Sequence, residues 1–240
     1  MIQEKNIYIN DDDYIIQKML STDWFETTKK EYIDIVFKNL NIEKYDEVTL
    51  LDIGSHLGLW TIRIAEQSKF LDLKFKGYLY EPSSNNIQCL KKNIGDIDVE
   101  IYNNVVASYD AYMRPAENNN HGSFDMFGDS IGKFVGHKIP DHELNGAKII
   151  ILPCMSTDFE ILKLFDKTYL QEDVLIVAQL IEKNLAKKNH TREEVISFLQ
   201  QRRFNVKKYD LNFSHLDPHL EHTYFFHDSV FDIFIFPKQF

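Results

Sequence analysis

An aspartate and two glycines stand close together in the segment Asp52-x-Gly54-x-x-x-Gly58. An apolar run at residues 47–53 leads into this segment, and a helix-like stretch at residues 57–68 follows it. The glycines therefore lie where a buried strand turns into a helix. Glycine lets the backbone turn sharply and lets a ligand approach closely, which a Cβ atom would obstruct. The spacing predicts a small-molecule site outside the carboxyl end of this strand.

A second carboxylate, Glu81, ends the next predicted strand at residues 73–80. A carboxylate in that position accepts hydrogen bonds from ribose hydroxyls. Asp52 can orient the amides of the glycine turn, or it can meet the cationic amino group of a methionine moiety. Two alternatives stay open. The glycines can serve a tight turn that holds no ligand, and Glu81 can be a solvated charge at a strand end.

The glycine turn departs from the loops that bind dinucleotides. It reads Gly54-Ser55-His56-Leu57-Gly58, without the middle glycine of G-x-G-x-x-G and with an aspartate before the first glycine. In the dinucleotide motif a pyrophosphate rests on a helix N-terminus. S-adenosylmethionine has no phosphate, so the turn favours S-adenosylmethionine as the cofactor. A nicotinamide oxidoreductase is the rival hypothesis, and it predicts dinucleotide binding.

Four stretches of the chain resemble the FkbM-type methyltransferases: residues 52–61, 80–93, 102–108 and 121–124. The resemblance covers residues 47–236. It implies a Rossmann-like class I methyltransferase fold and O-methylation with S-adenosylmethionine, often of sugars in polysaccharides, glycolipids or natural products. By matching position it implies cofactor contacts from four residues, with a fifth bordering adenine: Asp52, Gly54, Gly58, Glu81 and Asn104.

Two further residues of the glycine turn, Ser55 and His56, join the predicted cofactor site. His56 either touches the methionine end of the cofactor or caps the following helix. The chain departs from the family after the fourth predicted strand, where Asp-x-Glu-Gly is usual and residues 153–156 read Pro-Cys-Met-Ser. That run lies near the transferred methyl in this architecture. Two functions therefore stay open, an O-methyltransferase for a sugar, glycan or small-molecule hydroxyl and a cofactor-binding pseudoenzyme of the same fold.

A hydroxyl acceptor needs a base to take its proton, and histidine is the usual base because its pKa lies near working pH. We favour His121, which stands beside Gly122 in the family's acceptor-facing stretch, and Asp125 is the rival base. A solvated loop side chain is the alternative interpretation of both. The other histidines considered are His56, His137 and His142.

No metal site is predicted. A second histidine cluster lies late in the chain, but Pro218 interrupts any helix that would align its first two members. No cysteine ligand lies near it. A polar surface loop is the expected role of this cluster, which consists of His215, His219, His222 and His227.

Strands and helices alternate along the chain, which predicts an α/β fold with a mostly parallel sheet and helices on both faces. Strands are expected at residues 47–53, 73–80, 99–107, 148–152, 174–181, 205–209 and 231–236, and helices at 57–68, 83–94, 158–166 and 191–201. The last two strands lack a helix between them, so an antiparallel terminal strand is expected. Residues 1–46 form a predicted N-terminal helical cap with a helix at 23–40, and residues 47–240 form the methyltransferase domain with an insertion at about 109–147.

The 240 residues carry a formal net charge of −10, which argues against a nucleic-acid partner. The two cysteines indicate a reducing compartment. The sequence shows no targeting segment and no apolar run long enough to span a membrane, so a cytoplasmic location is expected. The acceptor and the oligomeric state stay open, a homodimer being one option.

Overall fold

The computed structural model describes residues 7–8, 33–40, 42–106, 111–116, 120–125, 132–134, 136–137, 145–152, 158–165, 174–180, 185–186, 188–202, 204–209 and 232–237. The run at residues 153–156, His142 and the histidines between 215 and 227 lie outside these residues. Of the predicted helix at 23–40, the described part is helical at residues 33–39. None of the helices in the described part of the chain is long and apolar enough to cross a membrane.

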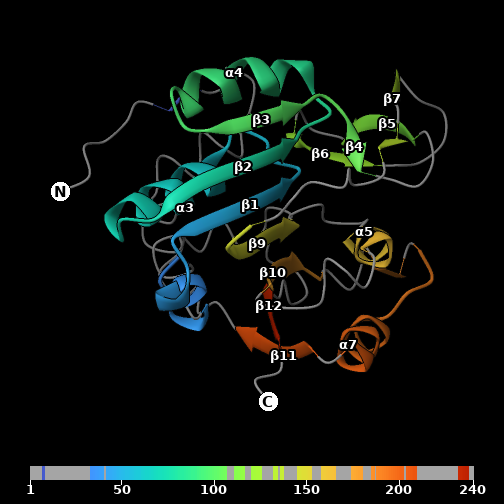
Figure 1. The fold of residues 1–240 in the computed structure, drawn as a ribbon. Helices are drawn as coiled ribbons and strands as arrows, with labels where there is room; N and C mark the ends of the chain where they lie inside the picture. Colours follow the sequence, from blue (N-terminus) through green and yellow to red (C-terminus); the bar gives the residue numbers. More distant parts are fainter. Residues whose placement is uncertain are drawn as a thin grey trace, which may run out of the picture.

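Seven strands form the main sheet in the order β11-β12-β10-β9-β1-β2-β3 (Figure 1). They are β1 (Glu47–Ile53), β2 (Lys74–Tyr80), β3 (Val99–Tyr102), β9 (Ala147–Leu152), β10 (Val174–Gln179), β11 (Phe204–Tyr209) and β12 (Asp232–Pro237). Within this sheet the five strands β10, β9, β1, β2 and β3 are parallel. β12 pairs antiparallel with both β10 and β11. The predicted Rossmann-like α/β sheet with an antiparallel terminal strand is confirmed.

Helices cover both faces of this sheet, as predicted. They are α3 (Leu59–Phe70), α4 (Ser84–Ile94), α5 (Asp158–Leu164) and α7 (Arg192–Gln201), with a short 3-10 turn, η1 (Ile42–Lys44). Alternate residues of β1 enter two different cores. Leu51 and Ile53 pack in a cluster with residues of α5 and α7, whereas Val48 and Leu50 pack with residues 33–40 and α3. Burial on both faces explains why the parallel strands read as continuous apolar runs.

The predicted insertion contains the short strands β5 (Ala111–Ala116), β6 (Asn120–Asp125), β7 (Gly132–Phe134) and β8 (Gly136–His137), and β4 (Val105–Val106) lies just before it. β5 pairs antiparallel with β6 and β7, and β4 pairs in parallel with β8. In Figure 1 this part of the chain is drawn on the side toward which the arrows of β1, β2 and β3 point.

The prediction of one continuous strand over residues 99–107 is wrong. β3 ends at Tyr102, and the chain resumes as β4 at Val105, outside the main sheet. The physical cause is Asn103, whose side-chain amide donates to the carbonyls of Glu81 and Pro82. These bonds tie the end of β3 to the neighbouring loop and end the ladder of strand bonds there.

Candidate functional site

Asp52 is fully buried in β1, where it lies opposite Leu79 of β2 and Ile151 of β9. The hydroxyl of Thr61, in the first turn of α3, donates to Asp52 Oδ2 at 2.6 Å. A hydrogen bond to a buried carboxylate is one of the stronger polar contacts in a protein. Asp52 therefore joins the strand to the helix on either side of the glycine turn.

Replacing Thr61 by valine removes this donor and keeps the shape of the side chain. We expect a loss of about 2 kcal/mol in the free energy of unfolding, because the buried carboxylate loses a hydrogen bond. Thr49→Val is the matched control, since Thr49 is also buried and its hydroxyl donates to a neutral carbonyl, that of Asn145, at 2.6 Å. The control should lose only about 1 kcal/mol. Urea unfolding measures both, and equal losses would contradict the role given to Asp52.

The first two amides of the glycine turn converge on one carbonyl oxygen of β2. Gly54 N and Ser55 N donate to Tyr80 O at 2.8 and 3.1 Å, and Ser55 Oγ lies 3.3 Å from the same atom. Gly54 has a φ of 84°, and His56, which is not a glycine, has a φ of 50°. A positive φ in a residue with a Cβ persists only where surrounding contacts hold it. The turn is therefore fastened to the end of the neighbouring strand.

Gly58 begins α3 in the left-handed conformation, with a φ of 78°, and its N–H donates to Ser55 O at 2.7 Å. A Cβ atom at this position would lie 2.5 Å from Leu90 Cδ1 and 2.9 Å from Ile94 Cδ1. Both side chains belong to α4. The approach of a ligand is one reason for a glycine here, and the structure adds a second, the close packing of α3 against α4.

Glu81 follows β2 directly and is only 3% exposed. Its Oε2 accepts a hydrogen bond from His56 N at 2.9 Å, and its Oε1 accepts from Ser83 N at 2.8 Å and from Asn86 Nδ2 at 3.2 Å. The alternative of a solvated strand-end charge is therefore wrong. One carboxylate links the glycine turn to the start of α4.

The pKa of Glu81 is raised above its ordinary value because burial disfavours the charged carboxylate. The nearby His56 side chain and the three donors act in the opposite direction. A buried carboxylate surrounded by donors at the carboxyl end of a strand is typical of a binding site.

Asn103, which the sequence did not single out, is bonded to the loop that carries Glu81, and the contact of its neighbour Asn104 with adenine stays a prediction. Asn103 Nδ2 donates to Glu81 O at 3.0 Å and to Pro82 O at 2.8 Å, and Ser84 Oγ donates to Asn103 Oδ1 at 3.2 Å. Asn103 is exposed and Asn104 is partly exposed. Two successive asparagines after a strand were the available signal, but only the geometry distinguishes them.

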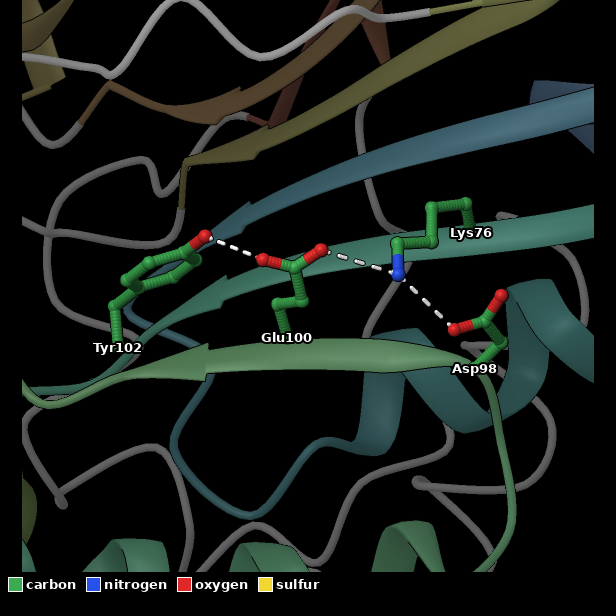
Figure 2. A network of polar contacts seen from close by, with 4 residues as sticks. All are labelled: Lys76, Asp98, Glu100 and Tyr102. Carbon is green, nitrogen blue, oxygen red and sulfur yellow. Dashed lines mark hydrogen bonds and ion pairs between the residues drawn. The ribbon is translucent and has the colours of Figure 1, made fainter.

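A polar network crosses the neighbouring strands on the face that carries Tyr80 (Figure 2). Lys76 Nζ lies 3.1 Å from Asp98 Oδ1 and 3.2 Å from Glu100 Oε1, and Tyr102 OH donates to Glu100 Oε2 at 2.7 Å. The rings of Tyr80 and Tyr102 stack with centroids 4.9 Å apart. The network thus reaches the residue whose carbonyl holds the glycine turn.

Burial, followed by the bond to Glu100, raises the pKa of Tyr102 to about 12 from 10.0. The folded protein thus holds this proton more tightly than the unfolded chain does. The resulting stability is complete below pH 10 and is lost as the pH rises from 10 toward 12. Glu100→Gln should lower the pKa of Tyr102, because it removes the negative charge. Tyrosinate absorbance titrations, each compared with the matching Tyr102→Phe variant, measure this pKa, and an unchanged value would contradict the contribution of Glu100.

The structure places both candidate bases, His121 and Asp125, on β6. This strand belongs to the small sheet β6-β5-β7 and not to the main sheet, which holds Asp52 and ends beside Glu81. Their role as bases stays a prediction. Within the described ranges, no three His, Cys, Asp or Glu side chains are grouped so that they could hold a metal ion.

Solved methyltransferases share this architecture. A Listeria monocytogenes structure, provisionally assigned as an S-adenosylmethionine-dependent methyltransferase, aligns with a TM-score of 0.51 at 10% identity and covers 85% of this chain and 96% of that chain. The FkbM methyltransferase of Methylobacillus flagellatus KT gives 0.49 at 10% identity over 80% of this chain, which spans only 44% of that protein. The plantazolicin methyltransferase BpumL, in complex with SAH, gives 0.43 at 15% identity over 95% of this chain and 91% of that chain.

No family model matches the chain, and no curated protein matches its sequence. The likeness to the Listeria structure covers nearly the whole of both chains at a low identity, so it establishes the fold alone. The chain therefore has the Rossmann-like fold found in S-adenosylmethionine-dependent methyltransferases.

Proposed function

We propose that the chain is an S-adenosylmethionine-dependent methyltransferase. The observation that carries the proposal is the pairing of the glycine turn, Gly54 to Gly58, with the buried carboxylate of Glu81. This carboxylate accepts a hydrogen bond from the backbone amide of His56. Ligands of open α/β sheets bind outside the carboxyl ends of the strands, where both features lie. The fold is the expected setting for such a site.

The donor set around Glu81 fits a nucleoside hydroxyl. Among the described residues, two donors reach Oε1 and one reaches Oε2. A carboxylate offers about four acceptor positions, so one position at Oε2 stays open to a ribose hydroxyl. When bound, S-adenosylmethionine would supply a methyl group on a sulfonium, with a neutral thioether as the leaving group.

Asp52, Ser55 and His56 complete the proposed cofactor site, with Asn104 at the adenine. For Asp52, burial against Thr61 supports an indirect role, in which its carboxylate holds the start of α3 and so the glycine turn. His56 is partly exposed and lies in the turn itself, which supports a place near the methionine end.

The proposed acceptor is a hydroxyl of a sugar, a glycan or a related small molecule. His121 or Asp125 would take the hydroxyl proton as the oxygen–methyl bond forms. The main work of the remaining residues is then to align the acceptor and to exclude water. A cofactor-binding module without turnover is the second candidate, and the loss of the acidic run at residues 153–156 favours it.

Calorimetry with S-adenosylhomocysteine and with NAD tests the cofactor. Binding of S-adenosylhomocysteine but not of NAD is the expected result, and binding of NAD alone would overturn the proposal. Transfer of a labelled methyl group to a panel of glycans and small hydroxyl compounds then tests turnover, with His121→Ala and Asp125→Ala as the base variants. Cofactor binding with no transfer to any acceptor would favour the binding module.

A further inference from the structure

Asn93, in the last turn of α4, spans two parts of the chain that are far apart in sequence. Its Oδ1 accepts from Tyr8 N at 2.7 Å, and its Nδ2 donates to Tyr8 O at 3.0 Å. The same Nδ2 donates to Leu57 O, inside the glycine turn, at 3.1 Å. The side chain is only 6% exposed. Both of its donor positions and its acceptor are thus engaged.

Residues 7 and 8 are held on α4 by more than these bonds. Ile7 packs against an apolar cluster that includes Leu90 and Ile94, the two side chains nearest to Gly58. Lys92 Nζ lies 5.3 Å from the centroid of the Tyr8 ring. The segment therefore packs against the same part of α4 that supports the glycine turn.

Leu57 lies in the glycine turn between two residues whose backbone conformation is unusual. Its neighbours, His56 and Gly58, both have positive φ values, 50° and 78°. Leu57 itself is fully buried, and Asn93 fixes its carbonyl oxygen. A backbone held in this conformation depends on its anchors.

We propose that Asn93 is a positioning residue that couples Tyr8 to the cofactor turn. Two bonds to the Tyr8 backbone fix the orientation of the carboxamide, and the fixed carboxamide holds the Leu57 carbonyl. Loss of the Tyr8 contact leaves a buried amide free to rotate, and the turn then loses one of its anchors. The effect on cofactor affinity rests on the proposed function, but the coupling between the two segments does not.

Three variants of the full chain separate the contacts. Asn93→Asp keeps the acceptor for Tyr8 N and removes the donors to Tyr8 O and Leu57 O. Tyr8→Pro removes the backbone N–H that donates to Asn93 Oδ1, at an exposed residue outside the sheet core. Tyr8→Ala is the matched control, because it keeps both backbone groups and loses only the ring.

Hydrogen exchange of the His56, Leu57 and Gly58 amides tests the coupling without any ligand. Exchange is expected to rise about tenfold in Asn93→Asp and in Tyr8→Pro, as for the loss of a buried hydrogen bond, and to stay near wild type in Tyr8→Ala. Unchanged exchange in the first two variants would overturn the coupling. An equal rise in Tyr8→Ala would also overturn it, because the ring and not the backbone would then be responsible.

Calorimetry with S-adenosylhomocysteine tests the consequence for the site. Affinity should fall about fivefold to tenfold in the two coupling variants and less than about twofold in Tyr8→Ala. Faster exchange with unchanged affinity would overturn the role of Asn93 in positioning the cofactor site. Wild-type protein that binds no S-adenosylhomocysteine would overturn the proposed function, while the exchange data would still decide the coupling.

Discussion

Glu81→Ala is expected to lower the free energy of unfolding by about 3–5 kcal/mol and to abolish measurable binding of S-adenosylhomocysteine. The substitution removes the buried acceptor that three donors share: His56 N, Ser83 N and Asn86 Nδ2. Each buried donor without a partner costs about 1–3 kcal/mol. The glycine turn and the start of α4 also lose the group that links them.

Glu81→Gln is the conservative control. Its carbonyl oxygen can still accept from Ser83 N and Asn86 Nδ2, but its amide nitrogen would face the His56 N–H, donor against donor. We expect a smaller loss of about 1–2 kcal/mol, with weakened cofactor binding. Guanidinium unfolding and calorimetry measure the two effects. A fully stable Glu81→Ala variant that binds the cofactor normally would remove Glu81 from the site.

Gly58→Ala has the second largest expected effect, a loss of about 3 kcal/mol in the free energy of unfolding. The left-handed conformation costs a residue with a Cβ about 1–2 kcal/mol. The new methyl group would also lie 2.5 Å from Leu90 Cδ1, and overpacking of this kind costs about 1–3 kcal/mol. Equilibrium unfolding measures the sum.

A double-mutant cycle with Leu90→Val separates the two causes. Shortening Leu90 relieves the contact and leaves the backbone strain unchanged, so the two substitutions together should cost at least about 1 kcal/mol less than the sum of their separate effects. Additive losses would mean that the close contact with Leu90 is not the reason for this glycine. Cofactor affinity measured on the same variants would show how far the turn depends on that packing.

The architecture was largely readable from the sequence. Parallel strands buried on both faces, such as β1 and β9, appear as continuous apolar runs, and these runs alternate with helices. The strand after Glu100 was misjudged because its apolar residues continue past Tyr102, while the chain leaves the sheet at Asn103. The side chain that ends the strand bonds to residues about 20 positions away, which no local pattern reports.

The sequence by itself determined the alternating α/β order, the place of the glycine turn and the pairing of that turn with Glu81, because residue type, spacing and apolar period are local properties of the chain. Only the tertiary structure decided the partners of those residues. In the folded chain Thr61 donates a hydrogen bond to Asp52, and three donors bond to Glu81. Asn103, not Asn104, bonds to Pro82, and Asn93 bonds to both Tyr8 and Leu57. Tyr8 and Asn93 are 85 positions apart. Such hydrogen bonds form only when folding brings distant polar groups together in a buried site, where each must find a partner.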